Sequence, residues 1–481
     1  MRILVLNPPF LPKFSRASRS PAVAKGGTIY FPIWLAYATA VLEKEGHNVK
    51  LIDAPAEGLG EREVLSIAKS FMPELVVMDT ATASIYNDVK FLEKIKNETG
   101  SYGILVGTHP SALPEETLKI SDKIDAIARG EYDYTVRDLA AELERGGKEF
   151  EKIDGLSFRK SGKIIHNKNR ALIENLDEIP FVSEVYKKHL NIRNYFYSAN
   201  LYPEITIISG RGCPFQCTYC LLPQTMNGRG YRKRSVDNLL AEFEYIRKNF
   251  PEVKEIFIED DTFTADSERA AEFCRRKVEA GNKLVWSCNA RADVKLETLQ
   301  QMKKAGCRLL CVGVESGEQE ILNNIKKGTK IEGIRQFMKD AKKAGILIHG
   351  CFMLGNKGDT KETIRKTVDF AIELEPDTAQ FFPIMVYPGT EAYEWAKKEG
   401  FLLSEDFSKW LDEEGNHNCL VSRPGLTNKE LVEECNKGRK RFYMRPKYIL
   451  SKFIQIFTHP REAPRIIKST KTFLKHLTQG N

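Results

Sequence analysis

Three cysteines lie close together near the middle of the chain, in the segment Cys213-Pro-Phe-Gln-Cys217-Thr-Tyr-Cys220. Their thiolates are soft ligands, which suit an iron–sulfur cluster or zinc. A closed site of either kind usually takes four protein ligands, and the next cysteine in the chain is the distant Cys274. We therefore expect a [4Fe–4S] cluster with one iron left open for a small molecule. The alternatives are an incomplete zinc site or a chance grouping, which the short spacings disfavour.

The cysteines must be positioned by the elements around them. They follow an apolar run over 204–209 and a Gly-Arg-Gly turn over 210–212, so we expect them on a loop at the end of a strand. From residue 204 onward, apolar strands and helical segments alternate at the spacing of a β/α barrel. The expected strands are 204–209, 255–261, 284–291, 309–316, 347–354 and 378–387, with helices between them such as Val236–Phe250, Glu297–Gly306 and Lys330–Gly345.

The C-x3-C-x2-C spacing, with the aromatic Tyr219 just before the last cysteine, resembles the radical S-adenosylmethionine (SAM) superfamily. The resemblance implies a partial (β/α)6 barrel with Cys213, Cys217 and Cys220 as the cluster ligands. It also implies that the amino and carboxylate groups of SAM chelate the open iron. The reduced cluster then splits SAM into methionine and a 5′-deoxyadenosyl radical, and an external donor such as flavodoxin or ferredoxin supplies the electron.

The SAM site is expected at the carboxyl ends of the barrel strands. By resemblance, its residues are Tyr219, Asp260, Arg291, Glu315, Phe352 and Leu354. Asp260 would accept hydrogen bonds from the SAM ammonium, Arg291 would pair with the carboxylate, and Glu315 would bind the ribose hydroxyls. The second strand ends in Glu-Asp-Asp rather than the Gly-Gly-Glu of the family, which leaves the ammonium contact open. Taken singly, each residue could equally have an ordinary capping or ion-pairing role.

The first 150 residues show a second alternation of strands and helices. The expected strands are 2–7, 49–54, 75–80, 102–107 and 126–130, and the expected helices are 33–46, 62–72, 85–100 and 135–147. Near-continuous apolar strands between helices indicate a parallel sheet covered on both faces. We expect a doubly wound, flavodoxin-like sheet, whose ligands bind at the carboxyl ends of its strands.

The loops at those ends resemble the cobalamin-binding domain that precedes many radical SAM barrels. The matching pieces are Gly107-Thr-His109-Pro-Ser111 and Arg129-Gly-Glu131. The resemblance assigns to the cobalamin site Asn7, Pro8, Asp53, Thr80, Gly107, His109, Ser111 and Glu131. The Asp-x-His-x-x-Gly pattern that supplies a lower axial histidine is absent, so we expect His109 at the corrin periphery and no histidine on cobalt. A loop histidine satisfied by backbone, and a vestigial ligand site, are the alternatives.

Length and composition complete the outline. The 481 residues are expected to divide into a cobalamin-binding domain (1–148), a linker with a hairpin (149–200), the barrel (201–400) and a helical C-terminal region (401–481). No cysteine precedes Cys213, and the other seven form no second short-spaced cluster. This usage, the lack of a signal-peptide pattern and the lack of a spanning apolar run indicate a cytoplasmic protein. Buried free thiols are expected at these seven, with Cys288 and Cys351 nearest the predicted site.

The tail carries the net positive charge. Residues 441–481 hold nine Lys or Arg and one acid, a difference of eight that equals the formal net charge of +8. Ile449, Phe453 and Phe457 recur at helical spacing, which predicts an amphipathic helix. Such a helix can lie on the inner face of an anionic membrane, or dock on the barrel with its basic side in water. No recognition motif accompanies the basic patch, so nucleic acid is not expected as a partner.

These features together predict a cobalamin-dependent radical SAM enzyme that modifies an unactivated carbon of a small or lipid-like substrate. The architecture resembles hopanoid-associated radical SAM proteins and the anaerobic magnesium-protoporphyrin ester cyclases. We expect C-methylation, in which SAM supplies both the methyl group carried by cobalamin and the radical. The alternative reaction is a radical cyclisation or rearrangement without methyl transfer. The alternative without catalysis is a cobalamin or cluster sensor.

Overall fold

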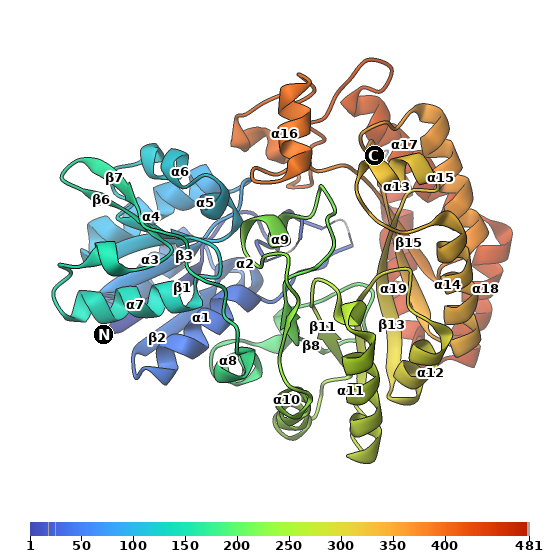
Figure 1. Cartoon of the computed structure of the whole chain (residues 1–481), viewed down its shortest axis with the longest axis horizontal. Helices are drawn as coiled ribbons and strands as arrows, with labels where there is room; N and C mark the ends of the chain where they lie inside the picture. The colour runs from blue at the N-terminus through green and yellow to red at the C-terminus, as the bar shows by residue number, and fades with distance from the viewer. Residues whose placement is uncertain (18, 25, 479–481) are drawn as a thin grey trace.

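The computed structural model describes residues 1–17, 19–24 and 26–478, with side chains described through Lys471. The end of the predicted basic tail, including the side chain of Lys475 and residues 479–481, therefore lies outside the described residues. Two parallel sheets, one in each half of the chain, organise the molecule (Figure 1).

The N-terminal sheet begins with five parallel strands in the order β2-β1-β3-β4-β5. They are β1 (Arg2–Asn7), β2 (Asn48–Asp53), β3 (Leu75–Asp79), β4 (Tyr102–Val106) and β5 (Ala126–Ala128). Helices α1 (Ile33–Lys44) and α7 (Asp133–Glu144) pack on one face, and α3 (Glu61–Phe71) and α4 (Ile85–Thr99) pack on the other. Alternate residues of β1 enter the two cores, which explains why its apolar run is continuous. The flavodoxin-like, doubly wound prediction is confirmed.

A hairpin extends this sheet to seven strands. β6 (Leu156–Lys160) pairs antiparallel with β5, and β7 (Lys163–His166) pairs antiparallel with β6. Its turn places Ser161 and Gly162 at φ angles of 50° and 77°, as a two-residue hairpin turn requires. The hairpin predicted within 149–200 thus lies in the N-terminal sheet.

The second sheet contains six parallel strands in the order β8-β11-β12-β13-β14-β15. They are β8 (Glu204–Ile207), β11 (Glu255–Ile258), β12 (Val285–Ala290), β13 (Cys307–Glu315), β14 (Leu347–Leu354) and β15 (Thr378–Pro383). The helices that connect them are α10 (Val236–Asn249), α11 (Ser267–Glu279), α12 (Leu296–Lys304), α13 (Gln319–Asn324), α14 (Ile331–Ala344) and α15 (Lys361–Leu374). β8 and β15 do not pair with each other, so the barrel is partial, as predicted.

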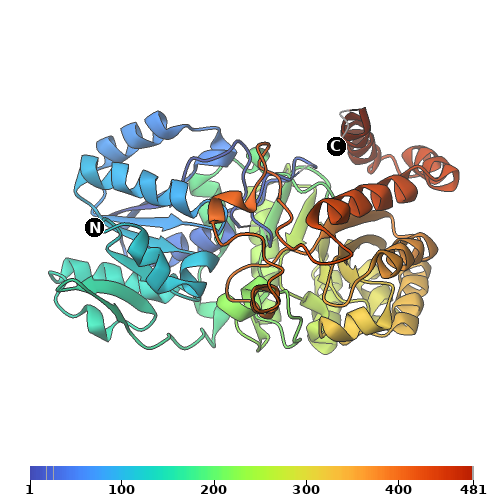
Figure 2. The same cartoon turned by 90° about the horizontal axis from the view of Figure 1, so that it is seen from above.

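The C-terminal region is largely helical, and its last helices lie together at one end of the molecule (Figure 2), where α17 packs on β15. It contains α16 (Glu391–Lys398), α17 (Asn428–Tyr443), α18 (Pro446–Thr458) and α19 (Ala463–Thr478). The Tyr443 hydroxyl donates to the carbonyl of Ala379 at 2.8 Å and accepts from its N–H at 2.9 Å, so α17 satisfies edge groups of β15. In the part of the chain that the structure describes, no helix is long and apolar enough to cross a membrane.

The remaining elements are short. They are α2 (Ala54–Glu57), α5 (Thr108–Ala112), α6 (Pro114–Ile120), α8 (Val182–His189), α9 (Leu221–Thr225), β9 (Gly210–Arg211) and β10 (Arg232–Lys233). Five 3₁₀ turns lie at Phe150–Lys152, Leu176–Glu178, Ile192–Asn194, Phe263–Ala265 and Phe407–Trp410.

Candidate active site

The cysteine loop is closed at its base by a two-stranded antiparallel ribbon. β9 leaves the barrel just after β8 and pairs with β10, so residues 212–231 form an excursion between them. Gly212 begins the loop at a φ of 86°, and a Cβ there would come within 2.0 Å of the Gly230 carbonyl oxygen. Only glycine fits this close approach between the two arms of the loop.

The three thiols are gathered on this loop. The Cys220 thiol donates a hydrogen bond to Cys217, which is the main reason that the pKa of Cys217 falls to about 6. The cations Lys327 and Arg291 lower the pKa of Cys217 further. Cys213 lies 3.8 Å from the Thr262 hydroxyl at the end of β11. Three soft donors on one loop, with cations alongside, fit an anionic iron–sulfur cluster with three protein ligands.

Tyr219 and Glu315, two of the residues predicted for the SAM site, meet beside the cysteines. The Tyr219 hydroxyl donates to Glu315 Oε1 at 2.9 Å, and Lys327 Nζ lies 3.0 Å from the same oxygen. Glu315 is 4% exposed and has a φ of 69°, a left-handed conformation that is unusual for glutamate. Such backbone strain at a buried carboxylate is typical of functional sites. Lys327 was not predicted, because nothing in its local sequence separates it from the other lysines.

Arg291 also lies against the cysteine loop. Its guanidinium stacks over the ring of Phe215, with 3.6 Å from Cζ to the ring centroid. It donates to the Lys327 carbonyl at 2.7 Å and to Asp293 at 3.0 Å. A rigid, stacked guanidinium is well suited to pair with a carboxylate.

Asp260 occupies a different environment from the other predicted SAM residues. Its carboxylate accepts hydrogen bonds from the backbone N–H groups of Ser209 and Gly210 and from the hydroxyls of Ser209 and Tyr231, at 2.6–3.0 Å. These contacts anchor the turn between β8 and the cysteine loop. Asp260 therefore holds the base of the loop in this structure.

Phe352 and Leu354 are placed in the hydrophobic core. Both are at most 1% exposed, and the Phe352 ring stacks on Phe381 with 5.2 Å between centroids. Phe352 pairs in register with Glu315 of β13 on one side and with Phe381 of β15 on the other, and Leu354 pairs with Pro383 of β15.

Four of the residues predicted for cobalamin are joined in one buried network. Asn7 Nδ2 donates to Asp53 at 2.7 Å, and Arg16 Nη1 donates to Asn7 Oδ1 and the Pro8 carbonyl at 2.7 and 2.9 Å. Arg16 also forms a buried ion pair with Asp88. The Asp88 carboxylate accepts a further hydrogen bond from the Thr80 hydroxyl at 2.7 Å. The carboxyl ends of β1, β2 and β3 thus share a polar cluster centred on Arg16.

The remaining predicted cobalamin residues divide into separate groups. The Ser111 hydroxyl donates to the Gly107 carbonyl at 2.6 Å and accepts from the Gly130 N–H at 2.9 Å. His109 is 1% exposed, and its Nδ1 lies 3.2 Å from the Thr82 hydroxyl. Burial lowers the pKa of His109 to about 3, so the ring is neutral.

Glu131 instead contacts the cysteine loop. Arg232 of β10 forms a two-point ion pair with it, in which Nη1 lies 2.8 Å from Oε2. Arg211 of β9 pairs in the same way with Asp133, at 2.7 Å. Two acids of the N-terminal domain therefore fasten both strands at the base of the cysteine loop, and we call the pairs Arg211–Asp133 and Arg232–Glu131 the clamp. All four side chains are less than 10% exposed, which makes these pairs strongly dependent on their geometry.

A small cavity lies between the two domains, just beyond this clamp. It is lined by Arg16, Ala17, Trp34, Asp79, Thr80, Gly107, Thr108 and Tyr132 of the N-terminal domain and by Leu222 and Met226 beside the cysteine loop. The buried Tyr132 hydroxyl has no hydrogen-bond partner among the described residues. Asp79, Thr80 and Thr108, at the carboxyl ends of β3 and β4, offer polar groups that could hydrogen-bond the edge of a corrin. The volume of about 10 Å³ holds one water, so the facing segments must move apart to admit a corrin.

The segment between β1 and α1 connects the two sites, which the sequence analysis missed. Arg16 belongs to the N-terminal network, whereas Arg19 lies against the end of β11, where it pairs with Glu259 and Asp261 at 3.0 Å each. The length of this connection was the available signal. Residues 8–32 link β1 to α1, and the described ones among them belong to no helix or strand; connections of this length are usually either functional or linkers.

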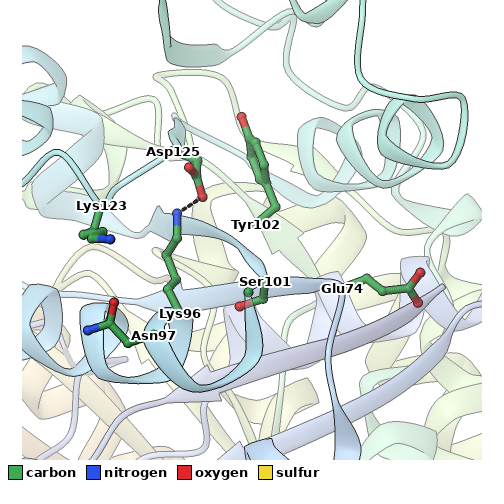
Figure 3. Close-up of a pocket in the computed structure, with 8 residues that line it drawn as sticks. Glu74, Lys96, Asn97, Ser101, Tyr102, Lys123 and Asp125 are labelled. Atoms are coloured by element: carbon green, nitrogen blue, oxygen red, sulfur yellow. Dashed lines mark hydrogen bonds and ion pairs between the residues drawn. The ribbon is translucent and has the colours of Figure 1, made fainter.

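A larger hollow lies at the opposite edge of the N-terminal sheet. Figure 3 shows its lining, where Lys96 and Asp125 form an ion pair. The hollow measures about 490 Å³ and opens at the amino ends of β3 and β4, beside Glu74 and Tyr102. It is remote from the strand ends that bind ligands in this fold, so it is separate from the candidate active site.

Comparison with known proteins agrees with this division of the chain. Residues 19–140 match the model of the B12 binding domain, and residues 207–371 match that of the radical SAM superfamily. The chain is 30% identical to the uncharacterized methyltransferase PH0819 of Pyrococcus horikoshii over 95% of both chains. It is 26% identical to the anaerobic magnesium-protoporphyrin IX monomethyl ester cyclase of Cereibacter sphaeroides, over 86% of this chain and 67% of that protein.

A solved structure shares the whole fold. The radical SAM methyltransferase TsrM from Kitasatospora setae, with cobalamin and a [4Fe–4S] cluster bound, superposes with a TM-score of 0.71 at 16% identity, over 98% of this chain and 99% of that one. A radical SAM domain implies a [4Fe–4S] cluster and SAM, and the B12 binding domain adds cobalamin. The chain belongs to the family of radical SAM enzymes that carry an N-terminal B12 binding domain.

Proposed function

We propose that this enzyme methylates an unactivated carbon of a small or hydrophobic substrate. The observation that carries the proposal is the cavity shared by the two domains, which Asp79, Thr80 and Gly107 line together with Leu222 and Met226. A methyl donor held by the first set lies next to a radical source held beside the second. The two reagents can thus act on the same carbon.

We assign separate roles to the residues of the candidate active site. Cys213, Cys217 and Cys220 hold the cluster, while Tyr219, Arg291, Glu315 and Lys327 border SAM. When bound, the cluster and SAM supply the radical that removes hydrogen from carbon, and cobalamin supplies the methyl group. Lys327 holds the Glu315 carboxylate at 3.0 Å, which keeps it in position to accept hydrogen bonds from the ribose hydroxyls.

The test separates methylation from the alternative cyclisation without knowledge of the substrate. The protein is reconstituted anaerobically with iron, sulfide and hydroxocobalamin, reduced, and supplied with SAM whose methyl group is deuterated. We expect label on the protein-bound cobalamin together with S-adenosylhomocysteine, and 5′-deoxyadenosine as a separate product. A protein that forms 5′-deoxyadenosine while its reduced cobalamin never acquires the label would contradict methylation and favour cyclisation or rearrangement.

The control removes only the radical source. A Cys213→Ala/Cys217→Ala/Cys220→Ala variant should lose 5′-deoxyadenosine formation and still acquire the label on cobalamin. If the parent yields neither product with its cluster and cobalamin in place, the hypothesis of a cobalamin or cluster sensor is favoured.

We further infer a hydrophobic, membrane-associated substrate from helix α18. Tyr448 and Lys452 dock this helix on the barrel through Asp377, at 2.9 and 3.5 Å. Its opposite side exposes five apolar residues, each 50–69% exposed: Ile449, Leu450, Phe453, Ile454 and Phe457. Two exposed basic residues follow this helix in the sequence, Arg461 just after α18 and Lys471 in α19. An exposed apolar helix face in a basic segment suits the surface of an anionic membrane.

A further inference from the structure

We propose that Cys311, His349 and Cys351 form a second metal site, which binds a zinc-type divalent cation with one coordination position open to the interior of the barrel. The three residues lie on the adjacent parallel strands β13 and β14, where Cys311 pairs in register with His349. Their candidate ligand atoms all lie within 4.8 Å of one another.

The three side chains point to the same face of the sheet. Cys311 packs with Tyr197 and Phe257, whereas its neighbours Leu310 and Val312 enter the main core. The strand alternation then places His349 and Cys351 on the face of Cys311. Cys311 precedes Glu315 by four positions, about 13 Å along a strand, so the site lies deeper in the barrel than the predicted SAM site.

The spacing of the two sulfurs fits a tetrahedral ion. With metal–sulfur bonds of about 2.3 Å, a tetrahedral zinc ion holds two thiolates about 3.8 Å apart. The Sγ atoms of Cys311 and Cys351 are 3.9 Å apart. A disulfide would require about 2.05 Å. The pair is therefore already spaced as two metal ligands, with little movement needed to admit the ion.

Neighbouring side chains hold the ligands from outside. His349 Nδ1 lies 2.7 Å from the Thr378 hydroxyl of β15, which fixes the orientation of the ring. The Tyr197 hydroxyl donates to Cys311 Sγ at 3.4 Å. Metal-bound histidines and thiolates are typically supported by outer hydrogen bonds of this kind.

The site is also accessible. Cys311, His349 and Cys351 are half-buried, unlike the fully buried Cys274, Cys288, Cys307, Cys419 and Cys435. Gln380, which pairs in register with Cys351, is exposed on the same face. Two thiolates and one imidazole favour zinc over hard cations. Three protein ligands leave a fourth position, which an oxygen or sulfur donor of a molecule in the barrel can occupy.

The test measures zinc on the full-length protein after cluster reconstitution, so that iron and zinc are counted on the same sample. We expect one zinc ion per chain that survives dialysis, and an X-ray absorption spectrum with sulfur neighbours at about 2.3 Å. The Cys311→Ser/Cys351→Ser variant should lose this zinc and retain the iron of the parent. A matched variant at a buried cysteine outside the site, Cys419→Ala, should retain both metals.

A variant outside the ligand set guards against loss of folding. Thr378→Val removes one hydrogen-bond partner of His349 and no ligand, and should weaken zinc binding about 10- to 100-fold in competition with a chromophoric chelator. Three outcomes would overturn the proposal: a parent with a complete cluster that takes up no zinc, a zinc content unchanged in the double cysteine variant, or a zinc spectrum without sulfur. Because zinc and iron are counted directly, none of these results depends on whether the enzyme is a methyltransferase.

Discussion

The guanidinium of Arg211 lies 2.7 Å from the carboxylate of Asp133, and this buried ion pair ties the start of the cysteine loop to the N-terminal domain. Arg211 also lies over the rings of Trp34 and Tyr37 of α1, so the charge is enclosed by aromatic surface. Its counterpart at the other strand of the ribbon is the Arg232–Glu131 pair. The candidate cluster site and the candidate cobalamin site thus share one boundary.

Replacing Asp133 should therefore damage the junction between the domains. Asp133→Asn leaves the buried Arg211 with only the more distant Glu131, 4.0 Å away, as a counter-charge, and breaking a buried pair typically costs about 3–5 kcal/mol. We expect a clearly lower melting temperature and weaker cluster retention. The exposed Arg275–Glu279 pair provides the control, since Glu279→Gln should change stability by about 1 kcal/mol or less. Equal melting temperatures for the two variants would contradict a structural role for the clamp.

Glu315 should be important for SAM binding but not for the cluster. Glu315→Gln removes the charge that Lys327 and Tyr219 hold in place, and hydrogen bonds to charged groups contribute about 1.5–3 kcal/mol. We expect SAM affinity, measured by equilibrium dialysis on reconstituted protein, to fall about 10- to 100-fold. The nearby Glu318, which pairs with Lys366, is the matched control. If Glu318→Gln weakens SAM binding as much as Glu315→Gln, the assignment of Glu315 is wrong.

Asp79 should make the stability depend on pH. Burial raises its pKa from 3.8 to about 7, so the folded protein keeps this proton over a range in which the unfolded chain releases it. Between these two pKa values the folded state binds more protons, so its stability falls as the pH rises. We expect the melting temperature of the parent to drop from pH 5 to pH 8, and that of Asp79→Asn to drop less. Asp122, whose side chain is 99% exposed, gives the control variant Asp122→Asn, which should follow the parent.

The apolar face of α18 should bind anionic vesicles. Phe453→Ser/Phe457→Ser removes two side chains that are 59% and 69% exposed, so we expect vesicle co-sedimentation to fall while the melting temperature stays unchanged. Leu403→Ser, at a 53% exposed position elsewhere, should have no effect on binding. Equal co-sedimentation of parent and double variant would rule out this face as the contact.

Deletion of the tail is a poor substitute for these point changes. Glu462, between α18 and α19, pairs with Arg308 of β13 at 3.0 Å, and Arg308 also pairs with Glu255 of β11. A chain that ends at residue 446 would lack Glu462 and so remove one of the two acidic partners of the buried Arg308, at the amino ends of the barrel strands. Loss of activity in such a deletion would therefore say nothing about membranes.

Local sequence was sufficient to predict the two sheets and the cysteine loop. Buried parallel strands require continuous apolar runs, and a cluster loop requires closely spaced thiols, so both are visible in short windows. Glu315 was named as a candidate from the rule that barrel sites lie at strand ends, and Tyr219 from its place in the cysteine motif. Each of these features depends on chemistry within a few residues of one position.

The long-range pairs could not be predicted in this way. Lys327, Arg16 and Arg19 gain their roles only from partners contributed by other elements, such as Glu315 for Lys327 and Asp88 for Arg16. Asp260 satisfies the same strand-end rule as Glu315, yet its four hydrogen bonds fasten a turn. The half-buried Cys311 and His349 join Cys351 only through the pairing of β13 with β14.

The two ion pairs of the clamp also have consequences for the order in which the domains form during synthesis. Asp133 precedes Arg211 by 78 positions and Glu131 precedes Arg232 by 101, so the ribosome releases the acidic partners well before the arginines. Domains of this size fold as units while the rest of the chain is still being made. The N-terminal domain is therefore a template on which the nascent cysteine loop closes, and iron and sulfide are delivered to thiols that a finished neighbour already holds in place.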